Sequence, residues 1–223
     1  MKNKSIKISL VLNIIIFIFV LFASIMMFTG LKFMHKYDIV LESTRLGMLR
    51  FFTVQSNLFM GIISLIFIID EINILKGNKK EISFNKYILK LMSTSAVGLT
   101  FFVVFTYLGP ITKYGILSLL MNSNLFFHLI IPVLSIITFI FFERTDKIKF
   151  KHVLYGIVPT FIYGIYYLTN VLIHTENGMV SPKYDWYWFV QGGIWTALVV
   201  VPVIFFVSYL ISLGLWAINK NKK

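Results

Sequence analysis

Residues 6–30 read IKISLVLNIIIFIFVLFASIMMFTG, and Lys7 is the only charged side chain among them. A helix that crosses the hydrocarbon core of a bilayer, about 30 Å thick, needs about 20 predominantly apolar residues. This run is also roughly twice as long as the core of a signal peptide. We therefore expect it to be a retained membrane span rather than a cleaved leader.

Five further segments have the same length and apolar character. The six predicted spans cover residues 6–30, 49–72, 89–111, 125–143, 153–173 and 194–219. Each is long enough to cross a bilayer, and the loops between them are too short to form a soluble domain. We predict an all-α polytopic membrane protein whose residues 1–223 form a single six-helix transmembrane domain.

The composition excludes several classes of protein. Only 13% of the 223 residues are charged and 58% are hydrophobic, against about 25% charged in a typical soluble domain. The absence of cysteine excludes disulfides, thiolate metal sites and a cysteine nucleophile. His128, His174 and Asp185 match no metal-ligand spacing, so we expect no metal and no cofactor. The nine acidic residues lie in loops or at span ends, which argues against an ATPase, a kinase or a carboxylate-based proton pump.

The basic residues indicate how the chain crosses the membrane. A formal net charge of +12 would suggest nucleic acid in a soluble protein, but here the Lys and Arg residues lie between apolar runs. Fifteen of the 21 lie in the N-terminal segment, the second loop, the fourth loop and the C-terminal tail. By the positive-inside rule both termini are expected in the cytoplasm. We predict a multi-pass cell-membrane protein with lipids, and not nucleic acid, as its partners.

Polar side chains inside the spans form stripes. Arg50, Thr53, Asn57 and Ser64 lie at offsets that share one face of the second helix, and Ser56 flanks them. Polar groups in a membrane helix are costly and usually face the interior of the bundle. This stripe is therefore a candidate site, although Ser and Thr in membrane helices also bond their own backbone or a neighbouring helix.

The fourth and fifth spans and the fifth loop carry similar residues. They are Asn124, His128, Pro132 and Ser135, then Thr160, Tyr163, Tyr167, Asn170 and His174, and finally Tyr184 to Trp188. The predicted topology brings His128, Asn170, His174, the residues of the fifth loop and the start of the second span to the outer third of the bilayer. An imidazole inside a span needs a partner and suits proton transfer, whereas the Trp and Tyr residues of the loop favour an interfacial aromatic belt.

Three stretches resemble a known family. They are the run RFFTVQSN at residues 50–57, NLFFHLIIP at 124–132, and YDWYWF at 184–189. Together they resemble bacterial six-helix integral membrane proteins. They are more distantly similar to the androgen-induced and androgen-dependent membrane proteins of animals, which hydrolyse fatty acid esters of hydroxy fatty acids.

The resemblance implies a catalytic pair. In the animal relatives a threonine on an early span and a histidine on a later one are the proposed pair, which Thr53 and His128 match. The animal spacing from histidine to proline is one residue longer, and the continuation Gln55 to Asn57 belongs to the bacterial group only. Ser56 therefore remains an alternative nucleophile.

These observations lead to three hypotheses. The first is an intramembrane lipid ester hydrolase in which Thr53 attacks and His128 is the base. Asn57, Asn124 and Ser56 would form an oxyanion or polar pocket, and Arg50 would hold a lipid headgroup or carboxylate. The expected pocket lining is Tyr163, Tyr167, Asn170 and Asp185. The sequence identifies no residue that orients His128, and the candidates for this role are Tyr163, Tyr167 and Asp185. The alternatives are a non-enzymatic protein that binds or transports a small amphiphile, and a scaffold subunit.

Overall fold

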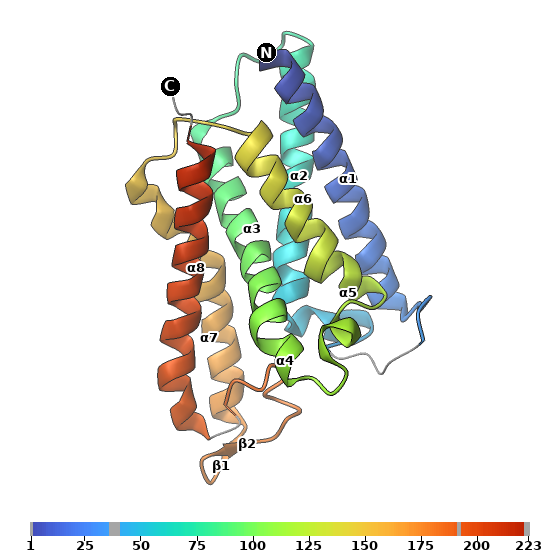
Figure 1. Cartoon of the computed structure of the whole chain (residues 1–223), viewed down its shortest axis with the longest axis vertical. Coiled ribbons are helices and arrows are strands. Elements are labelled where there is room, and N and C mark those ends of the chain that lie inside the picture. The colour runs from blue at the N-terminus through green and yellow to red at the C-terminus, as the bar shows by residue number, and fades with distance from the viewer. Residues whose placement is uncertain (1, 36–40, 191–192, 221–223) are drawn as a thin grey trace.

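The computed structural model describes residues 2–35, 41–190 and 193–220, and it is a bundle of membrane-length helices (Figure 1). Six helices in this part of the chain are long and apolar enough to cross a membrane, so the predicted fold class is confirmed. The spans are Asn3–Thr29, Phe52–Leu75, Phe84–Ile111, Ser123–Phe142, Phe150–Ile173 and Ile194–Asn219.

Several spans are built from consecutive helical segments. The α-helices are α1 (Lys2–Thr29), α2 (Phe52–Leu75), α3 (Phe84–Val103), α4 (Gly109–Ile111), α5 (Ser123–Leu125), α6 (Ile131–Ile137), α7 (Val158–Ile173) and α8 (Ala197–Asn219). The π-helices are η2 (Val104–Leu108), η4 (Phe126–Ile130) and η5 (Thr138–Phe142). The 3₁₀-helices are η1 (Arg45–Arg50), η3 (Gly115–Leu119), η6 (Phe150–Ile157) and η7 (Ile194–Thr196).

Two of the π-helices have a local cause in the sequence. Pro110 follows η2 and Pro132 follows η4, and neither proline has an N–H to donate to the carbonyl four residues before it. The proline ring also crowds that carbonyl, which belongs to Thr106 or His128, and a wider turn relieves the conflict. His128 therefore lies in an irregular turn of its span.

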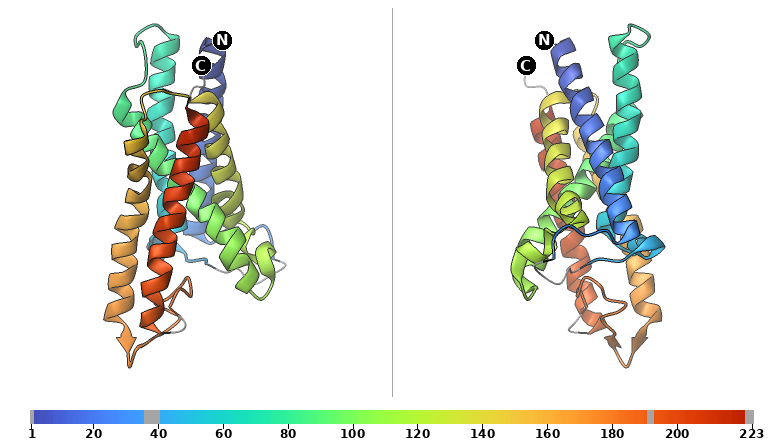
Figure 2. Two further views of the ribbon diagram at one scale, coloured as in Figure 1. Left: turned by 60° about the vertical axis from the view of Figure 1, so that its left-hand side comes forward. Right: turned by 90° about the vertical axis from the view of Figure 1, so that its right-hand side faces the viewer.

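Both chain termini lie at the same end of the bundle, which we call the proximal end, and the opposite end is the distal end (Figure 1). The span that contains α3 is the most buried of the six. A hairpin of β1 (Thr175–Glu176) and β2 (Met179–Val180) projects from the distal end (Figure 2). Its turn, Asn177 and Gly178, has positive φ at both residues, as a tight hairpin requires.

The third span begins at Phe84, five residues before the predicted start at 89, and this changes the role of one lysine. Lys90 is one of the fifteen basic residues that the sequence places in or beside the predicted cytoplasmic segments, in its case the second loop, but its side chain is fully buried. The helix tolerates this charge because the Lys90 ammonium lies 3.1 Å from a carboxylate oxygen of Glu143.

Candidate functional site

Thr53 lies in the first turn of α2, at the distal end, and its side chain is buried. The helix begins only at Phe52, because Phe51 has an extended backbone that separates α2 from η1. Arg50 therefore belongs to the preceding 3₁₀-helix and not to the predicted helical stripe. Asn57 and Ser64 are buried along α2 with Thr53.

Asn57 connects the start of α2 to the turn that carries His128. Its Nδ2 atom donates to the Thr53 backbone oxygen at 2.7 Å and to the Phe127 backbone oxygen at 3.1 Å. The structure thus brings together two of the stretches singled out from the sequence. Asn124, the other expected polar-pocket residue on that span, is buried in the turn before His128.

His128 is 1% exposed and is held by the backbone of a neighbouring loop. Its Nδ1 atom lies 2.5 Å from the Leu119 carbonyl oxygen. A carbonyl can only accept, so Nδ1 carries the proton of the neutral ring and Nε2 keeps its lone pair. Nε2 is buried and has no hydrogen-bond partner among the residues that the structure describes. The orienting group is therefore a backbone carbonyl, and not Tyr163, Tyr167 or Asp185.

The Thr53 hydroxyl and the His128 ring are not hydrogen-bonded to each other. The hydroxyl of Thr53 lies against the phenol of Tyr187, whereas His128 bonds only through Nδ1 to the described part of the chain. Ser56 donates to the Thr53 backbone oxygen at 3.0 Å and lies 3.2 Å from the Thr100 hydroxyl of α3. Ser56 is thus engaged in the contact between two helices.

Thr53 lies on the wall of an apolar cavity between the distal halves of α2, α3, α7 and α8. The space among the lining side chains is about 750 Å³, including the part that is open to the surroundings. The polar residues of its lining are three threonines and three tyrosines: Thr53, Thr100, Thr160, Tyr163, Tyr167 and Tyr187. Of the predicted site residues, Thr53, Tyr163 and Tyr167 line this cavity. The others lie outside its lining: Arg50, Ser56, Asn57, Asn124, His128, Asn170 and Asp185.

The loop before η7 closes the distal end of this cavity. The Tyr187 hydroxyl accepts the Phe52 backbone N–H at 2.7 Å, and Trp186 Nε1 donates to the Tyr163 hydroxyl at 3.0 Å. Trp186 and Tyr187 are buried, so the interpretation of these two rings as an interfacial belt is wrong. They are buried because their polar atoms satisfy groups at the start of α2 and on α7.

Asp185 fixes the conformation of this loop. Its Oδ1 atom accepts the Tyr167 hydroxyl and the Phe189 N–H (2.9 Å), and its Oδ2 atom accepts the Val190 N–H at 3.0 Å. Asn170 supports the same loop by donating to the Tyr184 carbonyl at 2.9 Å. Both residues therefore position the wall of the cavity rather than line it. Among the described residues no group of three His, Asp or Glu side chains could hold a metal ion.

Arg50 lies beside the same loop. Its guanidinium carbon is 4.8 Å from the centre of the Phe51 ring and 5.7 Å from that of Trp186. Its Nε atom has no hydrogen-bond partner within residues 2–35, 41–190 and 193–220, and the side chain is half-buried. A guanidinium so placed can still form a bidentate contact with an anion.

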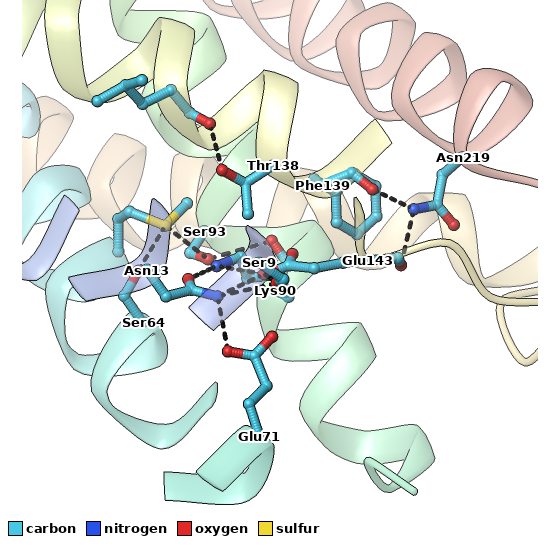
Figure 3. Close-up of polar contacts among 12 residues, drawn as sticks. Ser9, Asn13, Ser64, Glu71, Lys90, Ser93, Thr138, Phe139, Glu143 and Asn219 are labelled. Atoms are coloured by element: carbon cyan, nitrogen blue, oxygen red, sulfur yellow. Dashed lines mark hydrogen bonds and ion pairs between the residues drawn. The ribbon is translucent and has the colours of Figure 1, made fainter. Parts of the chain in front are cut away.

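Sequence reasoning missed a second polar cluster, in the proximal half of the bundle (Figure 3). Glu71 of α2 and Glu143 after η5, which both lie at the ends of predicted spans, meet around Lys90 and Asn13. The available signal was a lysine and an asparagine within predicted spans, because such residues need partners. Comparison with family models, with curated proteins and with solved structures found no match to this chain.

Proposed function

We propose that this membrane protein hydrolyses a lipid ester within the distal half of its bundle, with Thr53 as nucleophile and His128 as base. The observation that carries the proposal is the position of the Thr53 hydroxyl on the wall of an apolar cavity. The distant similarity to the animal hydrolases, whose proposed threonine and histidine are matched by Thr53 and His128, supports the same assignment.

The cavity suits an acyl chain. Most of its lining is aliphatic or aromatic, as in ligand pockets generally. The few hydroxyl groups lie where an ester group would need orientation. An acyl chain among the side chains of α3, α7 and α8 would place its carboxyl end near Thr53.

The geometry of His128 suits a general base. The Leu119 carbonyl keeps the proton on Nδ1, so Nε2 can take the proton of a hydroxyl. Thr53 Oγ1 would attack the acyl carbon and lose its proton to Nε2, which would pass it to the leaving alcohol. A water molecule would then lose a proton to Nε2 and attack the acyl-threonine. Nε2 would return the proton to Thr53 Oγ1 as the fatty acid is released. This requires Thr53 to turn from Tyr187 toward Nε2.

The developing oxyanion needs hydrogen-bond donors, and the candidates are Asn57, Tyr187 and Asn124. The Nδ2 atom of Asn57 already donates to two backbone oxygens, so it could serve only by giving up one of them. The Tyr187 phenol adjoins Thr53 on the same cavity wall, and Asn124 lies in the turn before His128. We propose these two as oxyanion donors, and Arg50 as the group that receives a lipid headgroup or carboxylate.

A second candidate function is binding or transport of an amphiphile without chemistry. It is favoured by one observation: His128, the proposed base, lies outside the lining of the cavity that Thr53 borders. In that case the apolar cavity would hold the lipid tail and Thr53 would only orient its polar end.

The test uses the purified full chain in lipid nanodiscs with a fluorogenic lipid ester and a fluorophosphonate probe. We expect turnover and labelling of the wild type, and loss of both in Thr53→Ala and in His128→Ala. Thr160→Ala is the matched control, because Thr160 lines the same cavity from α7. It should retain turnover.

Each outcome separates the candidates. Turnover that survives Thr53→Ala while Ser56→Ala abolishes it would move the nucleophile to Ser56. Turnover that survives Thr53→Ala and also survives Ser56→Ala eliminates the hydrolase assignment. If a non-hydrolysable ether analogue of the ester raises the Tm while the ester itself is not turned over, the protein binds the amphiphile without chemistry.

We further propose that the distal end faces away from the cytoplasm of a bacterial cell. The loops and termini at the proximal end carry most of the basic residues, which supports a cytoplasmic proximal end. Labelling of an introduced cysteine at Lys183 by an impermeant maleimide in intact cells would test this, with Lys149→Cys as the protected control.

A further inference from the structure

A buried cluster of polar and charged side chains joins four spans in the proximal half of the bundle (Figure 3). Its members are Ser9 and Asn13 of α1, Glu71 of α2, Lys90 of α3 and Glu143 at the end of η5, and each is at most 3% exposed. The cluster lies in the half of the bundle opposite to Thr53. Its chemistry is therefore independent of the function proposed for that residue.

Asn13 lies at the centre of the cluster. Its Oδ1 atom accepts a hydrogen bond from Lys90 Nζ at 2.6 Å. Its Nδ2 atom donates to Glu143 Oε1 at 2.8 Å and lies 3.4 Å from Glu71 Oε2. The asparagine thus connects the lysine to both carboxyl groups.

The two carboxyl groups are not equivalent. Glu143 Oε1 receives the Lys90 ammonium at 3.1 Å, the Asn13 amide, and the Ser9 hydroxyl at 3.3 Å. Glu71 has no ion pair with any described residue, and its bond to Asn13 is longer by 0.6 Å, the difference between 3.4 and 2.8 Å. Glu143 is therefore the better stabilised anion.

The charges of the cluster do not balance if both carboxyl groups are ionised. Lys90 supplies one positive charge against two negative ones, so one negative charge would lie uncompensated among apolar side chains. Burial of an unpaired charge in a bundle interior costs far more than burial of a neutral acid. The facing phenol of Tyr87 on α3 is neutral at pH 7 and offers no compensating charge.

The neighbouring cations are engaged elsewhere or point outward. Lys79 and Lys86 each form an ion pair with Asp70, at 2.7 and 2.8 Å, and Lys147 pairs with Glu81 at 2.7 Å. The remaining basic residues of the adjacent segments that the structure describes are exposed: Lys4, Lys7, Lys76, Lys80, Arg144 and Lys149. None of these side chains neutralises Glu71.

One atom of the cluster also lacks a partner. Glu143 Oε2 is buried, and no hydrogen bond reaches it from the described residues. A carboxylate oxygen in this state is a ready acceptor. The cluster therefore combines an excess negative charge with an unfilled acceptor.

We propose that Glu71 and Glu143 form a proton-binding site that holds one proton at neutral pH, with Glu71 as the protonated acid and Glu143 as the anion paired with Lys90. Glu143 Oε2 is the acceptor to which the proton can pass. Loss of the proton leaves a net negative charge where α1, α2 and α3 meet, which weakens the packing of these helices. The site thus makes the proximal half of the bundle sensitive to alkaline pH.

The test is infrared spectroscopy of the full chain in phosphatidylcholine nanodiscs, with thermal unfolding measured alongside. We expect the wild type at neutral pH to show the carbonyl band of a buried carboxylic acid. The Glu71→Gln variant should lose the band yet fold with an unchanged Tm, because glutamine resembles the neutral acid. The fall of Tm on raising the pH should be smaller in this variant than in the wild type.

Asp70→Asn is the matched control. Asp70 is the adjacent residue, but its two lysine partners keep it ionised, so this variant should retain the acid band. Glu143→Gln leaves Lys90 without its anion and is expected to lower the Tm strongly. The proposal therefore rests on Glu71→Gln and not on Glu143→Gln.

Two results would overturn the proposal. The first is a wild type without the acid band at neutral pH, and the second is a band that persists in Glu71→Gln. In the first case, a Tm that rises with sodium at constant ionic strength would show that a metal cation rather than a proton balances the charge.

Discussion

Asn57 Nδ2 lies 3.1 Å from the backbone oxygen of Phe127, so a single side chain joins the first turns of α2 to the π-helix that carries His128. The same atom donates to the Thr53 carbonyl at 2.7 Å. The spacing between the proposed nucleophile and the proposed base is therefore set by a buried amide. A change at Asn57 should alter both stability and activity.

We predict that Asn57→Ala lowers the free energy of unfolding by about 1–2 kcal/mol, because two hydrogen bonds are lost inside the bundle. Ester turnover should fall with it. Asn73→Ala is the control, since Asn73 makes a similar bond to the Ile69 carbonyl at 2.9 Å on an exposed face. Chemical unfolding in detergent measures the stability of both variants. Equal effects of the two substitutions would contradict a joining role for Asn57.

The membrane architecture could be predicted from the sequence because it depends on the length and hydropathy of the runs, as in residues 6–30. The irregular turns could not be located, because a π-helix depends on how a proline is accommodated and not on the proline alone. His128 illustrates this. Its position in a span was readable from the sequence, but its partner Leu119 lies in a loop that no periodicity describes.

The two misjudged features have a common physical cause. Trp186 and Lys90 belong to residue types that are usually found at membrane interfaces, and their burial depends on partners distant in the sequence. Trp186 finds the Tyr163 hydroxyl, and Lys90 finds Glu143. Composition and spacing do not show such pairings, which arise only when the helices are packed.

We predict that Tyr187 gives the fold a specific alkaline sensitivity. Burial raises the pKa of Tyr187 to about 12 from its usual value of 10.0. The folded state therefore keeps the phenol proton more tightly than the unfolded state does. The stabilisation is complete below pH 10 and is lost as the pH rises from 10 to about 12.

The Tyr187→Phe variant should flatten this dependence. It should also lower stability at neutral pH by about 1–2 kcal/mol, because the Phe52 N–H loses its acceptor. Unfolding midpoints measured across the alkaline range, with the exposed Tyr155→Phe as control, provide the check. An alkaline profile of Tyr187→Phe identical to that of the wild type would contradict the role assigned to this phenol.

Asp185→Asn should loosen the loop that covers the cavity. The carboxylate accepts three hydrogen bonds, whereas an asparagine has one acceptor oxygen and turns an N–H₂ group toward a donor. We expect a loss of about 1.5–3 kcal/mol in the free energy of unfolding. We also expect greater quenching of tryptophan fluorescence by iodide, as Trp186 becomes accessible. The exposed Asp146→Asn should change neither quantity, and an equal response of both variants would refute the structural role of Asp185.

Gly156 of η6 packs closely against Ser95 of α3 and Ser212 of α8. A Cβ atom at this position would lie 2.5 Å from Ser212 Cβ and 2.8 Å from Ser95 Oγ, so the helices cannot keep their positions. Small residues allow membrane helices to approach in this way. We predict that Gly156→Ala lowers the free energy of unfolding by about 1–3 kcal/mol through overpacking.

Gly214→Ala, within α8, is the matched control, because a Cβ there meets no described atom within 4 Å and alanine favours the helix by up to about 1 kcal/mol. Unfolding in detergent should place the two variants on opposite sides of the wild type. A Gly156→Ala variant as stable as the wild type would mean that α8 and η6 pack less closely than described.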